Sequence, residues 1–494
     1  MDSSKNNHHS ERCTMGVEGL DIVLSGGLPK NRLYLIKGDP GVGKTTLAMQ
    51  FLLEGVKCGE TGLYITLSET KDEIMVVAKS HGWDLAGIHL YELSSIEEKI
   101  RHDTESTFFH PSEIELNRTI SALIDEVKRV NPARVVFDSL SELRMLADTP
   151  LRYRRQILQL KQFFAGRDCT SLLLDDRSSN SNDLQVESIA HGVLVLSCAP
   201  SGYGVAQRQL RVVKIRGSEF MEGTHDLILK KGGMEIFPRL VAAEGITEFT
   251  RENFSSGIGE LDQLLGGGLG RGTSTIFMGP PGTGKSTLTL QFALRAAELG
   301  EKVLLFIFDE TLGTLLDRSA KMGMDLNPMV EKGMILIQTV DPAEISPGEL
   351  AHGARQAVTK NGVRMIIIDS INGYLNAMPA ERYLVLQLHE LLGYLNQQGV
   401  ITILVLAQQG LIGQMHASVD LTYLADTVLL LRFYESRGEV KQAISVIKKR
   451  SGDHERTIRR LIVNIKGISV GEPLHEFQGV LTGVPMLMDA QEAR

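Results

Sequence analysis

Two glycine-rich stretches carry the residues with the clearest chemistry in this chain of 494 residues. Each fits the P-loop pattern Gly-x-x-x-x-Gly-Lys-[Ser/Thr], and the two stretches end at Thr45 and Ser286. Glycines at this spacing allow a tight turn that aims successive backbone N–H groups at a phosphate, and the helix that follows adds its positive dipole end. The lysines, Lys44 and Lys285, would reach the outer phosphates of ATP, and the hydroxyls would bind Mg²⁺. The pattern therefore predicts two sites for ATP and Mg²⁺.

The residues predicted to hold the phosphates belong to these two loops and to the first turn of the helix behind each loop. They are Gly38, Gly41, Val42, Gly43, Lys44, Thr45 and Thr46 in the first copy, and Gly279, Gly282, Thr283, Gly284, Lys285, Ser286 and Thr287 in the second. A turn that only connects a strand to a helix is the alternative interpretation. Because both copies lie between an apolar stretch and a helical stretch, we favour phosphate binding.

Two aspartates are candidates for the second protein contact to each metal ion. Asp138 and Asp369 each end a run of apolar residues. A carboxylate at the end of a buried strand can reach Mg²⁺ beside the phosphates. The predicted metal ligands are therefore Thr45 with Asp138, and Ser286 with Asp369. An aspartate that only caps the next turn is the alternative, and the matching pair argues against it.

Acidic residues also follow the next predicted strand of each half, where they could orient a water molecule or a substrate hydroxyl. These are Glu69 in the first half, and Asp309 and Glu310 in the second. A carboxylate beside the outermost phosphate can act as a base in that reaction. The alternative is a strand-end side chain that faces only solvent.

The order of apolar and helical stretches indicates the elements that must position these residues. In the first half, strands are predicted at residues 33–37, 62–67, 134–137 and 171–174, with helices at 45–58 and 114–130. Strands that alternate with helices are typical of an α/β domain with a mostly parallel sheet and helices on both faces.

The chain contains this arrangement twice. The two P-loop lysines, Lys44 and Lys285, are 241 residues apart, and the strand-end aspartates, Asp138 and Asp369, are 231 residues apart. Landmarks that recur in the same order indicate a duplicated domain. We expect a disordered N-terminus at 1–13, domains at 14–245 and 246–485, and a short C-terminal tail at 486–494.

Composition favours a cytoplasmic protein. The chain is 43% hydrophobic and 23% charged, as in soluble globular proteins. It has no run of about 18 apolar residues for a membrane span, and its first residues lack the apolar segment of a signal peptide. Its four cysteines form no Cys-x-x-Cys pair, which favours reduced thiols over a zinc site. A net charge of −8 argues against binding to DNA.

Taken together, these motifs resemble the KaiC family, the double-domain RecA-like ATPases and autokinases of bacterial circadian clocks. The resemblance covers roughly Thr14 to Pro485 and rests on four features of each half: the P-loop, a Gly-Gly-Leu entry before it, acidic residues after the second strand, and a Lys-x-Arg near the end. It implies two tandem RecA-like P-loop domains and a homohexamer of two stacked rings, with ATP between neighbouring subunits. It also implies that four basic residues reach the neighbouring subunit's nucleotide, namely Lys214, Arg216, Lys448 and Arg450. On their own, such residues could equally form a solvated strand end.

The resemblance further implies Ser/Thr autophosphorylation in the second domain. The family's adjacent Ser-Thr pair corresponds here to Thr422 and Tyr423, so Thr422 is the candidate phosphorylation site. An unmodified turn position is the alternative. Tyr423 departs from the family pair, which argues against a two-site phosphorylation cycle.

Other departures concern the catalytic acids and the partners. Ser68 precedes Glu69 where clock members have two glutamates, and Asp309 is shorter than the glutamate of the family. The short tail argues against a KaiA-type activator. The charged stretch at residues 97–111 lies in the part of the first domain where family members can meet a small regulatory partner, so a KaiB-like partner is a candidate.

Three functions remain open from the sequence. The leading one is an ATPase, with candidate autokinase activity, that acts in signalling or timekeeping. A RecA- or helicase-like motor on DNA would share the same core. A nucleotide-gated scaffold with negligible turnover is the third, because one carboxylate of the first domain's acidic pair is replaced by Ser68.

Overall fold

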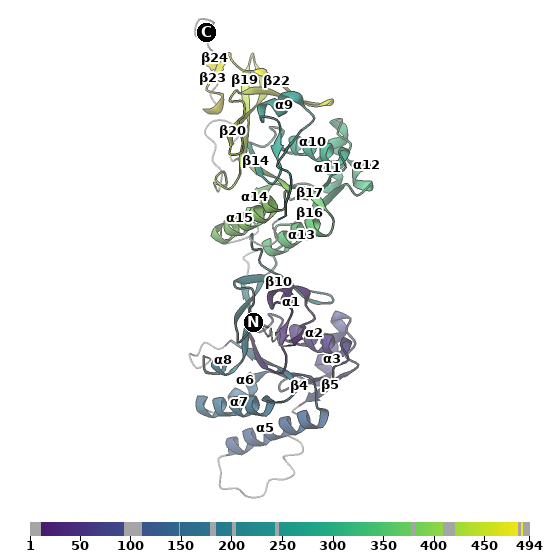
Figure 1. The fold of residues 1–494 in the computed structure, drawn as a ribbon, viewed down its shortest axis with the longest axis vertical. Helices are drawn as coiled ribbons and strands as arrows, with labels where there is room; N and C mark the ends of the chain where they lie inside the picture. The colour runs from purple at the N-terminus through teal and green to yellow at the C-terminus, as the bar shows by residue number, and fades with distance from the viewer. Residues whose placement is uncertain are drawn as a thin grey trace, which may run out of the picture. The chain divides into compact units, whose positions relative to one another are not determined.

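The computed structural model describes residues 11–92, 111–147, 149–177, 184–199, 204–242, 247–376, 381–408, 420–482 and 486–487. The chain divides into two compact units, Met1–Gly202 with Ala206–Arg239, and Tyr203–Val205 with Leu240–Arg494. In the described residues, each unit has one nine-stranded sheet with helices packed on it (Figure 1). This architecture confirms the predicted fold class of two tandem RecA-like α/β domains.

The first unit has its P-loop strand in the middle of the sheet. The strands follow the order β11 (Gly233–Phe237), β10 (Thr224–Lys230), β9 (Gln207–Ile215), β8 (Gly192–Ala199), β3 (Leu33–Gly38), β7 (Thr170–Asp176), β6 (Arg134–Asp138), β4 (Gly62–Thr66) and β5 (Ile88–Glu92). From β8 to β5 the strands run parallel, and β9, β10 and β11 extend the sheet antiparallel. The helices are α1 (Glu18–Val23), α2 (Lys44–Lys57), α3 (Lys71–His81), α5 (Pro111–Val130), α6 (Leu140–Leu146), α7 (Pro150–Phe164) and α8 (Leu184–Ile189).

The second unit repeats this topology. Its strands follow the order β22 (Gly467–Pro473), β21 (Arg459–Asn464), β20 (Glu439–Lys449), β19 (Thr427–Ser436), β14 (Ser274–Gly279), β18 (Ile401–Ala407), β17 (Val363–Asp369), β15 (Lys302–Ile307) and β16 (Ile335–Thr339). The helices are α9 (Gly259–Leu264), α10 (Lys285–Glu298), α11 (Leu312–Lys321), α12 (Asn327–Glu331), α13 (Pro347–Thr359), α14 (Ile371–Asn376) and α15 (Glu381–Gln397), followed by the short helix η2 (Val480–Thr482). Small two-stranded ladders complete both units: β1 (Arg12–Cys13) with β2 (Leu28–Pro29), β12 (Asn253–Phe254) with β13 (Leu269–Gly270), and β23 (Phe477–Gln478) with β24 (Met486–Leu487).

The strands are apolar on both sides, and alternate side chains fill two separate cores in each unit. In the first sheet, Ile36 and Tyr64 pack in the core with α1, α2 and α3. Their neighbours in sequence, Leu35 and Ile65, point to the other core, with α5, α6, α7 and α8. The second unit divides in the same way, with α10 and α11 on one face and α13 and α15 on the other. Burial on both faces explains the continuous apolar runs in the sequence.

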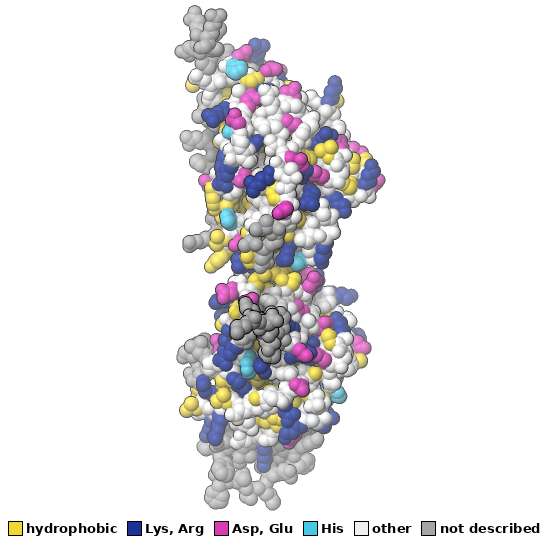
Figure 2. All heavy atoms as spheres, viewed as in Figure 1, with side chains coloured by type: hydrophobic (Ala, Val, Ile, Leu, Met, Phe, Trp, Pro, Cys, Tyr) yellow, Lys and Arg dark blue, Asp and Glu magenta, His cyan; other side chains and the backbone are white. Residues whose placement is uncertain are grey.

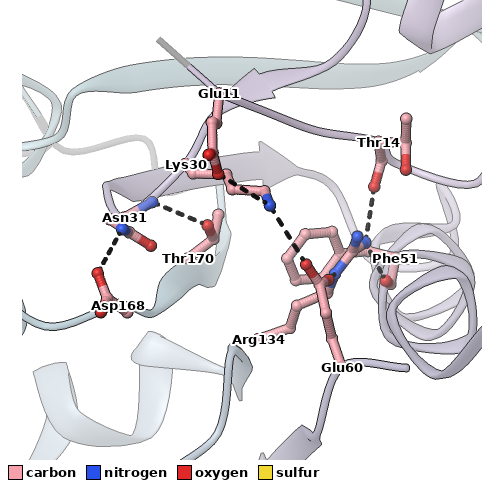
Figure 3. Close-up of polar contacts among 9 residues, drawn as sticks. All are labelled: Glu11, Thr14, Lys30, Asn31, Phe51, Glu60, Arg134, Asp168 and Thr170. Atoms are coloured by element: carbon pink, nitrogen blue, oxygen red, sulfur yellow. Dashed lines mark hydrogen bonds and ion pairs between the residues drawn. The ribbon is translucent and has the colours of Figure 1, made fainter. Parts of the chain in front are cut away.

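A buried arginine closes the amino-terminal end of the first sheet (Figure 3). Arg134, at the start of β6, is only 2% exposed. Its Nε lies 2.5 Å from Oε2 of Glu60, and Nη1 donates to the carbonyl oxygens of Thr14 and Phe51 at 2.7 Å each. The guanidinium also lies over the Phe51 ring, 4.8 Å from its centroid. The same place in the second sheet, four residues before the strand-end aspartate, is taken by the buried Met365.

The expectations for the two chain ends differ from the structure, and those for the domain boundary and the charged stretch concern residues that the structure does not describe. Arg12 and Cys13, which we expected in a disordered N-terminus, form β1, and Cys13 is buried. Met486 and Leu487, expected in the tail, pair as β24 with β23. The expected domain boundary near residue 245 and most of the charged stretch at 97–111 lie outside the described residues.

Candidate functional site: two P-loop nucleotide sites

The first P-loop connects β3 to α2, as the sequence predicts. Gly43 lies at the start of α2 with a φ of 102°, in the left-handed region that favours glycine. The Nζ of Lys44 donates to the carbonyl oxygens of Gly38 and Asp39, at 2.9 and 3.1 Å, and forms an ion pair of 2.8 Å with Asp176. The P-loop carbonyls and Asp176 therefore hold the Lys44 side chain at the carboxyl end of the parallel strands.

The predicted metal ligands of the first unit lie together. The Thr45 hydroxyl donates to Oδ2 of Asp138 at 2.8 Å, and the Tyr64 hydroxyl donates to the same oxygen at 2.5 Å. Asp138 is buried where β6 ends, beside β4. A hydroxyl and a carboxylate at the mouth of a P-loop are the donor types that Mg²⁺ prefers, so the site fits this ion.

Glu69 lies in the turn between β4 and α3. Its backbone N–H donates to the Thr66 hydroxyl at 2.9 Å, and that hydroxyl donates to the Glu69 carbonyl at 2.7 Å. Among the described residues, the buried Oε2 of Glu69 has no hydrogen-bond partner. Burial raises the pKa of Glu69, and the nearby carboxylates of Asp138 and Glu73 raise it further. A half-buried carboxylate with a raised pKa is well suited to accept a proton.

The second unit encloses a cleft of about 600 Å³ at the end of β14, and Lys285, Ser286 and Asp369 line it. That volume suits a nucleotide. The Nζ of Lys285 donates to the Pro280 carbonyl at 2.7 Å. Burial lowers the pKa of Lys285 to about 8 and raises that of Asp369 to about 6. Burial thus opposes the charge of both groups, which fits a site completed by a polyphosphate and a metal ion.

The acidic residues of the second unit are paired within the chain. The Ser370 hydroxyl donates to Oδ2 of Asp309 at 2.5 Å. Arg318, on α11, holds Glu310 with its Nη2 at 2.6 Å and its Nε at 3.4 Å. Arg318 also lines the cleft. Thr70 and Thr311 are the N-caps of the equivalent helices α3 and α11. Arg318 lies seven residues after Thr311, and the residue seven after Thr70 is Val77, so the first unit has a valine at the position of Arg318.

Replacing Arg318 with valine is expected to speed ATP turnover at the second site roughly three- to tenfold at pH 7, because the Glu310 carboxylate would no longer be occupied by the guanidinium and could accept a proton from the attacking water. The measurement is phosphate release in a Lys44→Ala background, in which only the second P-loop is intact. The converse change, Val77→Arg in a Lys285→Ala background, should slow the first site. Slower turnover in Arg318→Val would mean that the arginine positions Glu310 for the reaction.

The basic residues expected to reach a neighbouring subunit make matching contacts in the two units. Lys214 donates to the carbonyl of Glu187, and Arg216 donates to that of Ser188 at 2.7 Å. In the second unit the contacts go to the segment that carries the candidate phosphorylation site: Lys448 donates to the carbonyl of Thr422 at 2.7 Å, and Arg450 to that of Tyr423 at 2.7 Å. Neither Lys448 nor Arg450 lines the cleft of their own unit among the described residues.

Thr422 lies in a turn, partly exposed, and its hydroxyl donates to Oδ1 of Asp420 at 2.6 Å. Because Lys448 and Arg450 hold the carbonyls of Thr422 and Tyr423, this segment is fixed beside the two basic residues.

The sequence reasoning missed three polar residues of these sites: Tyr64, Asp176 and Arg318. Asp176 ends an apolar strand, so the rule that found Asp138 could also have found it. Tyr64 and Arg318 lie within a strand and a helix, and their spacing carries no signal for the contacts they make.

Charged side chains of both signs are interspersed over each unit on the face drawn in Figure 2. Among the described residues, none of the helices is both long and apolar enough to cross a membrane.

The fold and the two P-loops define a protein with tandem RecA-like P-loop domains. A family model described as the KaiC ATPase matches residues 13–241 and 254–475, and the chain belongs to the KaiC family. The circadian clock oscillator protein KaiC of Parathermosynechococcus lividus is 25% identical in an alignment 506 residues long, which covers 97% of this chain and 88% of that protein. The protein of the same name from Synechococcus elongatus is 26% identical over 489 residues, which span 96% and 92%. At this identity the chain is a divergent member of the family.

Proposed function

We propose that both units bind Mg²⁺ and ATP and hydrolyse ATP, with the released energy used in signalling or timekeeping in the cytoplasm. The observation that carries the proposal is the repeated constellation of a P-loop lysine, a hydroxyl and a strand-end aspartate at one edge of each sheet, with an acidic residue close by. A glycine turn that only connects a strand to a helix does not require a hydroxyl, a strand-end aspartate and an acidic residue beside it in both copies.

In the proposed reaction, Lys44 and Lys285 hold the outer phosphates, while Thr45 with Asp138 and Ser286 with Asp369 hold the metal ion. When bound, Mg²⁺ neutralises negative charge on the phosphates. Glu69 accepts a proton from the attacking water in the first site. In the second site Glu310 is the corresponding base. Asp309, which accepts a hydrogen bond from the Ser370 hydroxyl, orients Glu310 or the attacking water.

We further propose that the second unit transfers the γ-phosphoryl group to the Thr422 hydroxyl of a neighbouring subunit in a homohexamer. Lys448 and Arg450 hold the Thr422 segment, and as cations they would stabilise negative charge on the phosphoryl group in transfer. In the ring formed by the first units, Lys214 and Arg216 would likewise stabilise negative charge at the nucleotide of the neighbouring subunit. The names of the relatives suggest a circadian role, and a KaiB-like partner stays a proposal of the same kind.

The test is incubation of the pure protein with γ-labelled ATP and Mg²⁺, with free phosphate and protein-bound label measured together. We expect phosphate release in the wild-type chain, a partial loss in Lys44→Ala or Lys285→Ala, and complete loss when both are changed. Protein-bound label should depend on Lys285 and disappear in Thr422→Ala, while Tyr423→Phe serves as the matched control.

Release of phosphate without label on the chain would contradict the autokinase proposal and leave the ATPase. No phosphate release above the double variant would favour a nucleotide-gated scaffold. Stimulation of hydrolysis by DNA would favour the DNA motor instead.

A further inference from the structure

The first nucleotide site contains a carboxylate that the second site lacks. Asp176 is the last residue of β7 and lies opposite Gly38 of the P-loop strand in the parallel register. In the second unit the corresponding register pairs Gly279 with Ala407. The two sheets therefore present an aspartate and an alanine at the same place beside their P-loops.

The Asp176 carboxylate is fixed on both of its oxygens. Oδ1 lies 2.8 Å from Nζ of Lys44, and Oδ2 accepts a hydrogen bond of 3.0 Å from the Ser141 hydroxyl. Next to it, Arg144 holds Asp175 at 2.5 Å, which anchors the end of the strand. Partial burial raises the pKa of Asp176, but the hydrogen bond and charge of Lys44 outweigh it and lower the pKa overall. Asp176 is therefore ionised at neutral pH.

The charge of the P-loop lysine is thus matched differently in the two units. Lys44 has a carboxylate partner and two carbonyl acceptors. Lys285 donates to the Pro280 carbonyl, and in the described part of the chain it forms no ion pair. In the second site a γ-phosphate would meet a lysine that feels the charge of Asp369 but has no carboxylate in ion-pair contact. In the first site it would meet a lysine already paired with a carboxylate.

We propose that Asp176 shifts the nucleotide preference of the first site toward nucleoside diphosphates. The γ-phosphate of ATP adds negative charge next to Lys44, where the Asp176 carboxylate already lies, and two like charges so close repel each other. A diphosphate lacks that group and keeps more of the Lys44 interaction with the β-phosphate. The inference rests on the proposed nucleotide function and adds a specificity-determining residue to it.

The experiment measures two dissociation constants for the first site, in a Lys285→Ala background that disables the second P-loop. The ligands are ADP and a non-hydrolysable ATP analogue, both with Mg²⁺. Asp176→Asn removes the charge and keeps the shape, and Asp176→Ala copies Ala407. Both variants are expected to shift the ratio of the two constants about tenfold in favour of the triphosphate, the size of one charge–charge interaction at a partly exposed site.

The converse experiment uses Ala407→Asp in a Lys44→Ala background, and there the second site should shift toward the diphosphate. The ratio of the two dissociation constants is measured within each variant. A loss of stability that weakens the binding of both ligands equally therefore leaves this ratio unchanged. A ratio that stays the same in Asp176→Asn, or moves toward the diphosphate, would overturn the inference. If Lys285→Ala binds neither ligand, the proposed function of the first site fails instead.

Discussion

Replacing Glu69 with glutamine is expected to lower ATP turnover at the first site by about two to four orders of magnitude, the usual contribution of a positioned general base. Glutamine keeps the size of the side chain and cannot accept the proton of the attacking water. The buried Oε2 of Glu69 has no partner in the described residues, and the raised pKa of its carboxyl group brings it closer to neutral pH. Nucleotide affinity should change little, because the P-loop contacts are intact.

The measurement is phosphate release in a Lys285→Ala background, so that only the first site turns over. Glu73→Gln is the matched control, and because Glu73 makes the smallest of the three contributions to the raised pKa of Glu69, it should change turnover far less. Glu73 lies four residues away on α3 and is exposed, and a glutamine there still completes the capping box with Thr70. Turnover in Glu69→Gln within threefold of the wild-type value would show that another group activates the water.

Replacing Glu60 with alanine is expected to destabilise the first unit by about 3–5 kcal/mol, because it leaves the Arg134 charge buried without its carboxylate. Arg134 is 2% exposed and cannot turn to solvent without opening the end of the sheet. Its remaining hydrogen bonds to the carbonyls of Thr14 and Phe51 do not neutralise the charge.

Urea unfolding followed by tryptophan fluorescence measures this effect in the full chain. Trp83 is the single tryptophan and belongs to the first unit, so its signal reports on that unit. The double variant Glu60→Leu with Arg134→Met, which copies Met365 of the second sheet, should recover most of the loss. A change below about 1 kcal/mol in Glu60→Ala would mean that water reaches the guanidinium.

The sequence contained enough to predict the central parallel strands and the phosphate loops. The four strands that we predicted in the first unit are short runs of apolar residues buried on both faces, and their observed bounds, such as Leu33–Gly38 and Arg134–Asp138, lie within a residue or two of the expected ones. The P-loop chemistry is local, since the glycines, the lysine and the hydroxyl follow one another in the chain. Local patterns of this kind can be recognised without any tertiary information.

The contacts that distinguish the two sites depend on strand order and helix orientation. Asp176 meets Lys44 because β7, and not β6, is the neighbour of β3, and strand order is a long-range property. Arg318 meets Glu310 because α11 packs with that face toward the cleft. Arg134 appears in the sequence as an ordinary charge at the start of a strand, and only packing shows that it is buried.

The different partners of the two P-loop lysines also affect how each unit tolerates the loss of its ligand. Lys44 has an ion pair and two carbonyl acceptors within the chain, so residues of the first site balance its charge themselves. The second site contains Lys285 and Asp369, and burial opposes the charge of each. Each attracts the other, but burial outweighs that attraction. Bound nucleotide and metal would add counter-charges to both groups, and a ligand that binds only the folded state stabilises it. We therefore expect Mg²⁺ and nucleotide to raise the free energy of unfolding of the second unit more than that of the first.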